Sequence, residues 1–323
     1  MLLTGILSRS FLNGFHNVQV SGVERFQETL KRARNEGRGV LTVANHISVI
    51  DDPLLWGLLP LRSMTDPKYL RWSLGAENIC FTTKLTEYFF SMGQVLSTRR
   101  FGVGPYQGAI DSAILLLSPS IRNSLSKSSE ITPATHPFPS GDLPPQWVHI
   151  FPESLVHQAY PPHKTTMKYF HWGVSRVLLE AEKMPIVVPV FHHGLEDVFP
   201  EDRESYKYVP RTVIFPRFSK KKRLPLNIKF GSAIDDIVFA DDRIKWEKLK
   251  HISVDGTEAR SLRSAVALKL RDAVSKVRSS MGLPEEDSRF KDVYFWSGTG
   301  ESNGVKIAGK YGNSKVSVIE KDG

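Results

Sequence analysis

Cysteine and long apolar runs are what this 323-residue sequence most clearly lacks. Cys80 is the only cysteine, so no intrachain disulfide can form and a small fold held together by disulfides is excluded. No segment approaches the roughly 20 consecutive apolar residues that a membrane-spanning helix needs. The sequence therefore predicts neither a disulfide scaffold nor a transmembrane helix.

Acidic residues are too few to balance the basic ones, and the net charge at pH 7 is +9. This charge favours anionic partners, which include nucleic acid, anionic lipid surfaces and phosphorylated substrates. Nucleic acid is not expected as a partner, because no aromatic RNA-binding motif accompanies the basic residues. The basic run Lys220–Arg223 stands between two prolines and fits either a solvated loop or a contact with lipid headgroups.

Alternating apolar segments predict an α/β fold with a central, mostly parallel sheet flanked by helices. With 41% hydrophobic residues, the chain can bury a sizeable core in one large domain or two small ones. The expected strands are 18–20, 40–44, 148–151, 186–191 and, less regularly, 227–230. The expected helices are 24–35, a helix that begins at Asp51, 105–117, 169–183 and 257–280.

Composition divides the chain into four regions. Residues 1–20 are an N-terminal segment, 21–256 the α/β domain, 257–296 a C-terminal helical region and 297–323 a disordered tail. Within the domain, residues 118–145 are rich in Ser and Pro and lack periodicity, so we expect a flexible insertion there.

The N-terminal segment is apolar but too short to span a bilayer. We expect it to lie in the plane of a membrane interface, with Arg9 near the headgroups. Its buried side chains would then be Leu2, Leu3, Ile6, Leu7, Phe11 and Phe15. A disordered start and a helix packed on the domain are the alternatives. Arg9 is the only basic residue before Glu24, so the segment is weak as a transit peptide.

The pattern richest in chemistry is His46, followed five positions later by Asp51. Asp51, Asp52 and Pro53 suit a helix start, where Asp takes up free N–H groups and Pro is tolerated. A carboxylate bonded to one ring nitrogen of the His fixes its tautomer and leaves the other nitrogen to accept a proton. This spacing also occurs by chance in many proteins, so a surface-loop His is the competing interpretation.

Three other motifs fail in their context. Gly300–Gly304 matches G-x-S-x-G, but a nucleophile elbow needs a strand–turn–helix frame and this motif lies in the expected tail. Gly102–Gly104 begins like a dinucleotide loop, but the next glycine comes one position too late. His192 and His193 have no H-E-x-x-H motif or cysteine cluster to complete a site, so neither a metal nor a cofactor is predicted.

Four blocks, in this order and at this spacing, resemble the signature blocks of the glycerolipid acyltransferase family. They are Asn45–Pro53, Gly93–Arg100, Phe151–Ser154 and Ile186–Val190. Longer matches are similar to the tafazzin branch of that family, and most similar to its fungal members. These matches are Asn45–Trp56 with its double Asp, Arg71–Ala76, Phe90–Gln94 and Tyr169–Gly173. Four coinciding blocks favour the catalytic interpretation of the His and Asp.

The resemblance implies a glycerolipid acyltransferase-like fold and a role for each matched position, which makes 21–256 the acyltransferase domain. His46 would be the general base that deprotonates a lysophospholipid hydroxyl, and Asp51 would orient it. Arg100, with Arg99 as a second candidate, would bind the substrate phosphate through a planar guanidinium. Glu153 would hold a glycerol hydroxyl or a headgroup.

Asn45, Ser48 and Ser154 complete the substrate-binding residues that these blocks imply. Ser154 stands where the family more often has glycine. Since glycine permits turns and close approaches that other residues resist, the backbone at this position is in question.

The tafazzin resemblance further implies a CoA-independent transacylase that moves acyl chains between phospholipids and lysophospholipids, among them cardiolipin, monolysocardiolipin and phosphatidylcholine. It implies interfacial attachment to mitochondrial membranes that face the intermembrane space. The residues alone support only acyl transfer to a lipid hydroxyl. An acyl-CoA-dependent acyltransferase and an inactive lipid-binding protein are the alternatives, and the presence of His46, Asp51, Arg100 and Glu153 disfavours the second. No oligomeric state is predicted.

Overall fold

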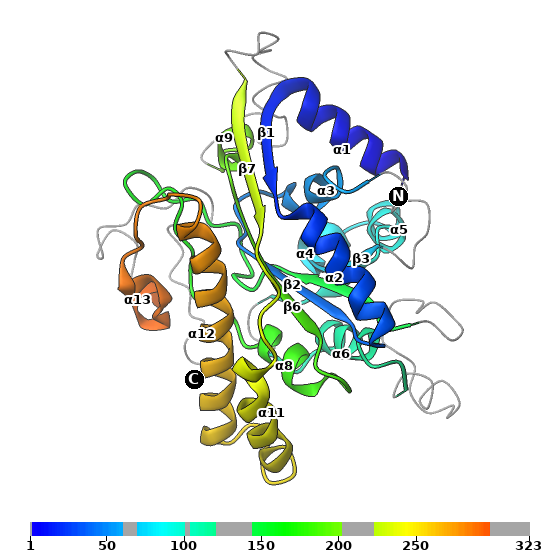
Figure 1. Ribbon diagram of the computed structural model, residues 1–323, viewed down its shortest axis with the longest axis vertical. Helices are drawn as coiled ribbons and strands as arrows, with labels where there is room; N and C mark the ends of the chain where they lie inside the picture. Colours follow the sequence, from blue (N-terminus) through cyan, green and yellow to red (C-terminus); the bar gives the residue numbers. More distant parts are fainter. Residues whose placement is uncertain (1, 61–69, 101–103, 121–143, 202–222, 298–323) are drawn as a thin grey trace.

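One sheet runs through the middle of the molecule, and helices pack around it (Figure 1). The computed structural model describes residues 2–60, 70–100, 104–120, 144–201 and 223–297. Within these residues the seven-stranded sheet has the order β1-β7-β6-β2-β5-β3-β4. Its strands are β1 (His16–Ser21), β2 (Val40–Ala44), β3 (Arg71–Ala76), β4 (Val95–Thr98), β5 (Trp147–Ile150), β6 (Ile186–His193) and β7 (Leu224–Phe230). Paired strands are parallel except β6 with β7, which confirms the predicted α/β fold around a mostly parallel sheet.

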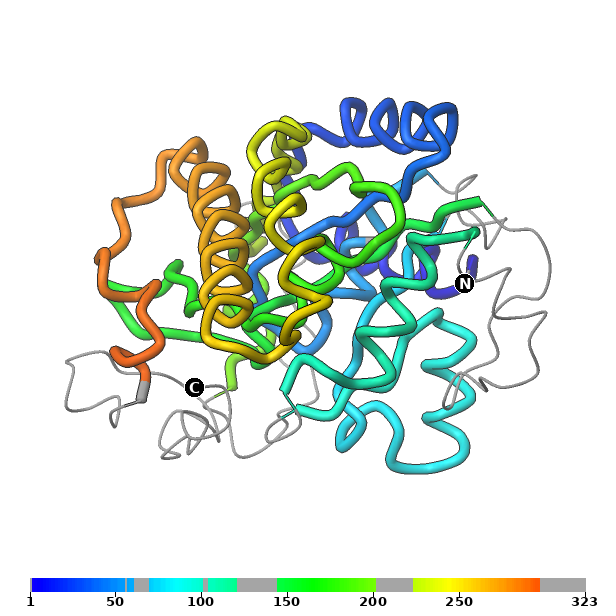
Figure 2. The backbone as a smooth tube through the Cα atoms, turned by 90° about the horizontal axis from the view of Figure 1, so that it is seen from below, coloured from blue at the N-terminus to red at the C-terminus, as the bar shows by residue number. Residues whose placement is uncertain are grey.

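Helices pack on both faces of the sheet. Helices α1, α2, α3 and α9 contribute to one core cluster, and α6, α8, α11 and α12 to the other. The last two, α11 and α12, lie side by side (Figure 2). Within the described ranges the helices are α1 (Leu2–Phe15), α2 (Val23–Asn35), α3 (Asp51–Trp56), α4 (Glu77–Cys80), α5 (Lys84–Met92), α6 (Gly108–Leu116), α8 (Gly173–Glu180), α9 (Leu195–Val198), α11 (Ile237–Leu249), α12 (Thr257–Ser279), η4 (Ser288–Lys291) and α13 (Val293–Ser297).

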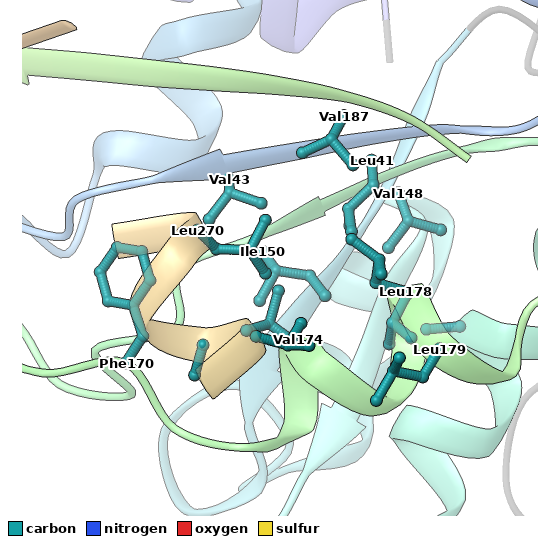
Figure 3. Packing of buried hydrophobic residues seen from close by; sticks show 14 of the residues in the cluster. Leu41, Val43, Val148, Ile150, Phe170, Val174, Leu178, Leu179, Val187 and Leu270 are labelled. Atoms are coloured by element: carbon teal, nitrogen blue, oxygen red, sulfur yellow. The ribbon is translucent and has the colours of Figure 1, made fainter. Parts of the chain in front are cut away.

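The larger core cluster lies between the sheet and helices α6, α8 and α12. Leu41 and Val43 of β2 point into it with the matching residues of β5, and they meet Leu270 of α12 (Figure 3). Because side chains alternate along a strand, Thr42 of β2 and His149 of β5 face the opposite side of the sheet. Polar residues therefore underlie the face on which α3 sits.

Most predicted elements are present, with shifted ends. The strand at 40–44 is confirmed to the residue, and those expected near 150, 190 and 228 are also present. The helix predicted at 169–183 begins only at Gly173, since the backbone N–H of His171 donates to the carbonyl of Pro152 at 2.9 Å instead of joining a helix. Strands β3 and β4 and helices α5 and α11 were not predicted from the sequence.

The N-terminal segment forms α1, which packs on α3. Small residues permit a close approach: a Cβ added to Gly57 would lie 2.8 Å from the backbone nitrogen of Arg9. Leu12 is buried against the domain, whereas Leu3 and Leu7 remain exposed. Among the described residues, no helix is both long enough and apolar enough to cross a membrane. Interfacial attachment of this segment stays a prediction.

Several expectations concern residues outside the described ranges. Most of the predicted flexible insertion, residues 121–143, falls there, as does almost all of the predicted tail, residues 298–323. The same holds for Lys220–Lys222 of the basic run. The C-terminal helical region is described, and its long helix α12 packs into the larger core cluster.

Candidate active site

The predicted site residues follow strands that end at the same edge of the sheet. Strands β2, β3, β4, β5 and β6 are mutually parallel, so their carboxyl ends lie together. His46 comes two residues after β2, Glu153 three residues after β5, and Arg99 and Arg100 directly after β4. In open α/β sheets this edge is where ligands bind.

His46 and Asp51 are in direct contact. Nδ1 of His46 lies 3.0 Å from Oδ2 of Asp51, and the same oxygen accepts the backbone N–H groups of Ile47 at 2.7 Å and Ser48 at 2.9 Å. An ionised carboxylate can only accept hydrogen bonds, so Nδ1 carries the proton and Nε2 has the free lone pair. This is the tautomer that a general base requires.

Exposure differs sharply between the two partners. The carboxylate of Asp51 is completely buried, whereas the His46 side chain is 21% exposed. The imidazole stacks on Phe151, with ring centroids 4.5 Å apart. The ring is thus held on one edge by a buried anion and on one face by an aromatic residue, while part of it faces solvent.

Glu153 holds the backbone of His46 through a hydrogen bond. Its Oε1 accepts the backbone N–H of His46 at 2.9 Å, and its Oε2 accepts that of Lys168 at 2.8 Å. Only 1% of the residue is exposed. Burial raises the pKa of Glu153 to about 8, although the two backbone donors oppose the shift. The predicted contact with a substrate hydroxyl or headgroup stays a prediction, and the observed contacts are with the backbone.

Asn45 joins two strand ends. Its side-chain amide donates to the carbonyl of His192 at 2.9 Å and accepts the backbone N–H of the same residue at 3.0 Å. The His192 ring in turn reaches the carbonyl of Asn45 at 3.0 Å, and it passes 3.8 Å from Oδ2 of Asp51. Both residues are buried, and burial lowers the pKa of His192. A neutral histidine therefore lies 3.8 Å from the Asp51 carboxylate, a neighbour that was not predicted from the sequence.

Ser48 and Ser154 shape the backbone of the site. Ser48 is fully buried and its hydroxyl faces the backbone N–H of Ile50 at 3.4 Å, inside the loop that wraps around Asp51. Ser154 has φ +62°, a left-handed conformation. Glycine adopts this conformation without the steric cost that a Cβ brings, so Ser154 holds a backbone conformation that suits glycine better. Substrate contacts of either serine stay predictions.

Arg99 and Arg100 extend from the end of β4 toward α4. The Nε of Arg99 donates to Glu77 at 2.8 Å, and Nη2 of Arg100 donates to Asn78 at 3.1 Å. Three strand spacings separate β4 from β2, a distance of about 14 Å. Arg99 and Arg100 thus follow a strand that ends at the same edge of the sheet as the strand before His46.

The second aspartate of the double Asp has a separate role. Asp52 forms a bidentate ion pair with Arg71 of β3 and accepts a hydrogen bond from Ser73 at 3.1 Å. Arg71 is 4% exposed, and burial lowers its pKa to about 10. This pair fastens the first turn of α3, which carries Asp51, to the sheet. The double Asp is part of the sequence resemblance, but its pairing with Arg71 was not predicted from the sequence.

Other titratable groups near the site are kept neutral by burial. The pKa of His149, whose Nδ1 lies 2.7 Å from the hydroxyl of Thr42, is lowered to about 3. The pKa of His157 is also lowered to about 3. In the described part of the chain, no group of three or more His, Cys, Asp or Glu side chains is arranged to hold a metal ion.

Comparison with known proteins assigns this arrangement to a class. A family model described as Acyltransferase matches residues 17–193, from β1 to the end of β6, and so includes every candidate residue above. The protein is an acyltransferase. Tafazzin from Saccharomyces cerevisiae is 39% identical to it over 96% of this chain and 86% of the relative. Taffazin from Dictyostelium discoideum is 30% identical over 85% of this chain and 84% of the relative. The chain belongs to the tafazzin family of phospholipid acyltransferases.

Proposed function

We propose that the protein is a CoA-independent transacylase that remodels cardiolipin by moving acyl chains between phospholipids and lysophospholipids, with His46 as general base and Asp51 as its orienting partner. The observation that carries this proposal is the 3.0 Å contact between Nδ1 of His46 and the buried carboxylate of Asp51. Family membership supports acyl transfer to a lipid, and the contact supplies a base for it.

The chemistry needs only two lipids and the imidazole. Nε2 of His46 takes the proton from a lysophospholipid hydroxyl. At the same time the hydroxyl oxygen attacks the ester carbonyl carbon of a donor phospholipid. The tetrahedral intermediate collapses by breaking the bond to the donor glycerol oxygen, which receives the proton from the imidazolium. The acceptor becomes a diacyl lipid and the donor a lysophospholipid, so neither water nor a thioester is consumed. Asp51 stabilises the imidazolium in between.

The remaining residues fit supporting roles. Arg100, with Arg99 beside it, binds the phosphate of a lipid at the end of β4. Glu153 and Asn45 hold the backbone of His46 and the end of β2 in place. Monolysocardiolipin and phosphatidylcholine serve as acceptor and donor in this scheme. The enzyme works at mitochondrial membranes that face the intermembrane space, attached interfacially through α1.

The donor is the point to test. Purified protein is supplied with phosphatidylcholine carrying a labelled acyl chain and with monolysocardiolipin, in the presence and absence of acyl-CoA. Label appearing in cardiolipin at the same rate without CoA supports the transacylase. A parallel reaction carries the label on acyl-CoA and leaves phosphatidylcholine unlabelled. Label that enters cardiolipin only in this second reaction would establish the acyl-CoA-dependent alternative instead.

A further inference from the structure

Helix α5 carries an apolar stripe that faces solvent. None of its residues is buried. Leu85, Tyr88, Phe89 and Met92 are 78%, 66%, 59% and 54% exposed. Their spacing of three, four and seven positions places them on one side of the helix, the pattern that normally faces a core. Large exposed apolar patches mark interaction surfaces.

The helix is nevertheless well built. Thr83 and Thr86 form a capping box, in which the N–H of Thr86 donates to the Thr83 hydroxyl at 3.2 Å and the N–H of Thr83 donates to the Thr86 hydroxyl at 3.0 Å. With α4 it forms the connection between β3 and β4, and β4 is the last strand of the sheet. Figure 2 shows this connection, in cyan, at the periphery of the molecule. Ile79 of α4 adds a further side chain that is 49% exposed.

The stripe adjoins the candidate phosphate-binding residues. Arg99 and Arg100 donate to Glu77 and Asn78, which begin the α4–α5 connection. A lipid phosphate bound at Arg100 would therefore lie at the root of this connection. In Figure 1 the N-terminal end of α1, where Leu3 is 68% exposed, points toward α5.

We propose that the α4–α5 connection, Glu77–Met92, is a second membrane-docking surface, whose apolar stripe enters the outer layer of a phospholipid bilayer that contains anionic lipid. This inference rests on the proposed function, because the substrates are lipids held in such a bilayer. Aromatic side chains beside guanidinium groups suit the boundary between headgroups and acyl chains. The net charge of +9 adds attraction to anionic headgroups.

The test uses the full chain and vesicles of phosphatidylcholine and phosphatidylglycerol in a ratio of about 3:1, so that anionic lipid is present. A variant with Leu85→Ser and Phe89→Ser is compared with a matched control, Ile237→Ser and Ile252→Ser, whose side chains are 77% and 81% exposed on and after α11. We expect vesicle affinity to fall about tenfold or more for the α5 variant, because two bilayer-buried side chains are lost. The control should bind like the parent, and an α5 variant that does so would overturn the proposal.

A spectroscopic measurement tests bilayer contact at a single position, so that the test does not depend on whether the double variant folds. In a Cys80→Ser background, Phe89→Cys is labelled with a polarity-sensitive dye, with Ile252→Cys as the control position. Vesicles should shift the emission to the blue at position 89 only. No shift there, or a shift produced by protein concentration alone, would refute the proposal, the latter by assigning the stripe to a second copy of the chain. Neither assay measures turnover, so their failure is distinguishable from failure of the acyl-transfer experiment.

Discussion

Replacing Asp51 by asparagine removes the charge that orients His46 while keeping the shape of the side chain. The amide oxygen of the variant can still accept the backbone N–H groups of Ile47 and Ser48, which lie 2.7 and 2.9 Å from Oδ2. All three bonds to this oxygen, including that from Nδ1 of His46, lose their anionic acceptor, so we expect a stability loss of about 2–3 kcal/mol. A domain with about 5–15 kcal/mol of stability stays folded after such a loss.

The effect on rate should be much larger. Without the carboxylate the tautomer of His46 is no longer fixed and its imidazolium is no longer stabilised, so acyl transfer should slow by about 10²- to 10⁴-fold. The assay is the initial rate of label transfer from phosphatidylcholine to monolysocardiolipin, divided by the amount of folded protein. Urea unfolding of the same preparations supplies the stability.

Asp52→Asn is the matched control. It leaves Arg71, which is 4% exposed, without its ionic partner and should cost about 3 kcal/mol of stability. Asp52 does not bond to His46. The transfer rate per folded molecule of the Asp52 variant should therefore fall less than tenfold, which corresponds to a rise of less than about 1.4 kcal/mol in the activation free energy. An Asp51 variant whose rate stays within about threefold of the parent, or an equal loss of rate in both variants, would refute the orienting role of Asp51.

Three further predictions concern residues around the pair. Burial raises the pKa of Glu153 from 4.5 to about 8. The contribution of Glu153 to the free energy of unfolding is therefore complete below its ordinary pKa and is lost as pH rises through 8. Glu153→Gln should therefore gain stability relative to the parent between about pH 5 and pH 9, as urea unfolding at each pH will show. Ser154→Gly should raise the free energy of unfolding by about 0.5–1 kcal/mol, because φ is +62° there; an unchanged urea midpoint would contradict this. Arg100→Gln should raise KM for the lysophospholipid by about tenfold. The more exposed Arg99→Gln should change it by less than about threefold, and equal effects would remove the distinction.

The part of the site that the sequence made predictable is local. The His46–Asp51 contact depends on a strand end, a short loop and an aspartate at a helix start, all within a few residues of each other. Residues 40–44 are buried on both faces, and their largely apolar pattern predicted a strand there. Long-range contacts did not have to be known for either inference.

Two of the missed elements, β3 and α5, break the rule that apolar residues face the core and charged residues face solvent. Strand β3 begins with Arg71, a buried charge that is paired with Asp52. Helix α5 exposes Leu85 and Phe89, so the rule that apolar residues lie in the interior does not predict its position at the surface. Burial of a charge and exposure of an apolar stripe both depend on partners distant in the sequence or outside the chain.

The directions of the polar side chains Asn45 and Glu153 could not be predicted from the sequence either. Asn45 faces inward because its amide pairs with the backbone of His192, which is 147 positions away in the sequence. Glu153 likewise turns both oxygens to backbone N–H groups, one of them on His46. Sequence blocks show which residues gather at a site, but the geometry decides which of them can reach a substrate.

Replacement of His46 by alanine tests the central claim most directly. The measurement is the transfer of a labelled acyl chain from phosphatidylcholine to monolysocardiolipin by purified protein, in the absence of CoA. The parent should transfer the label, and the His46→Ala protein, folded to the same extent by circular dichroism, should be slower by at least about 10²-fold. Transfer by that variant at the parent rate would contradict the account of this imidazole as the base.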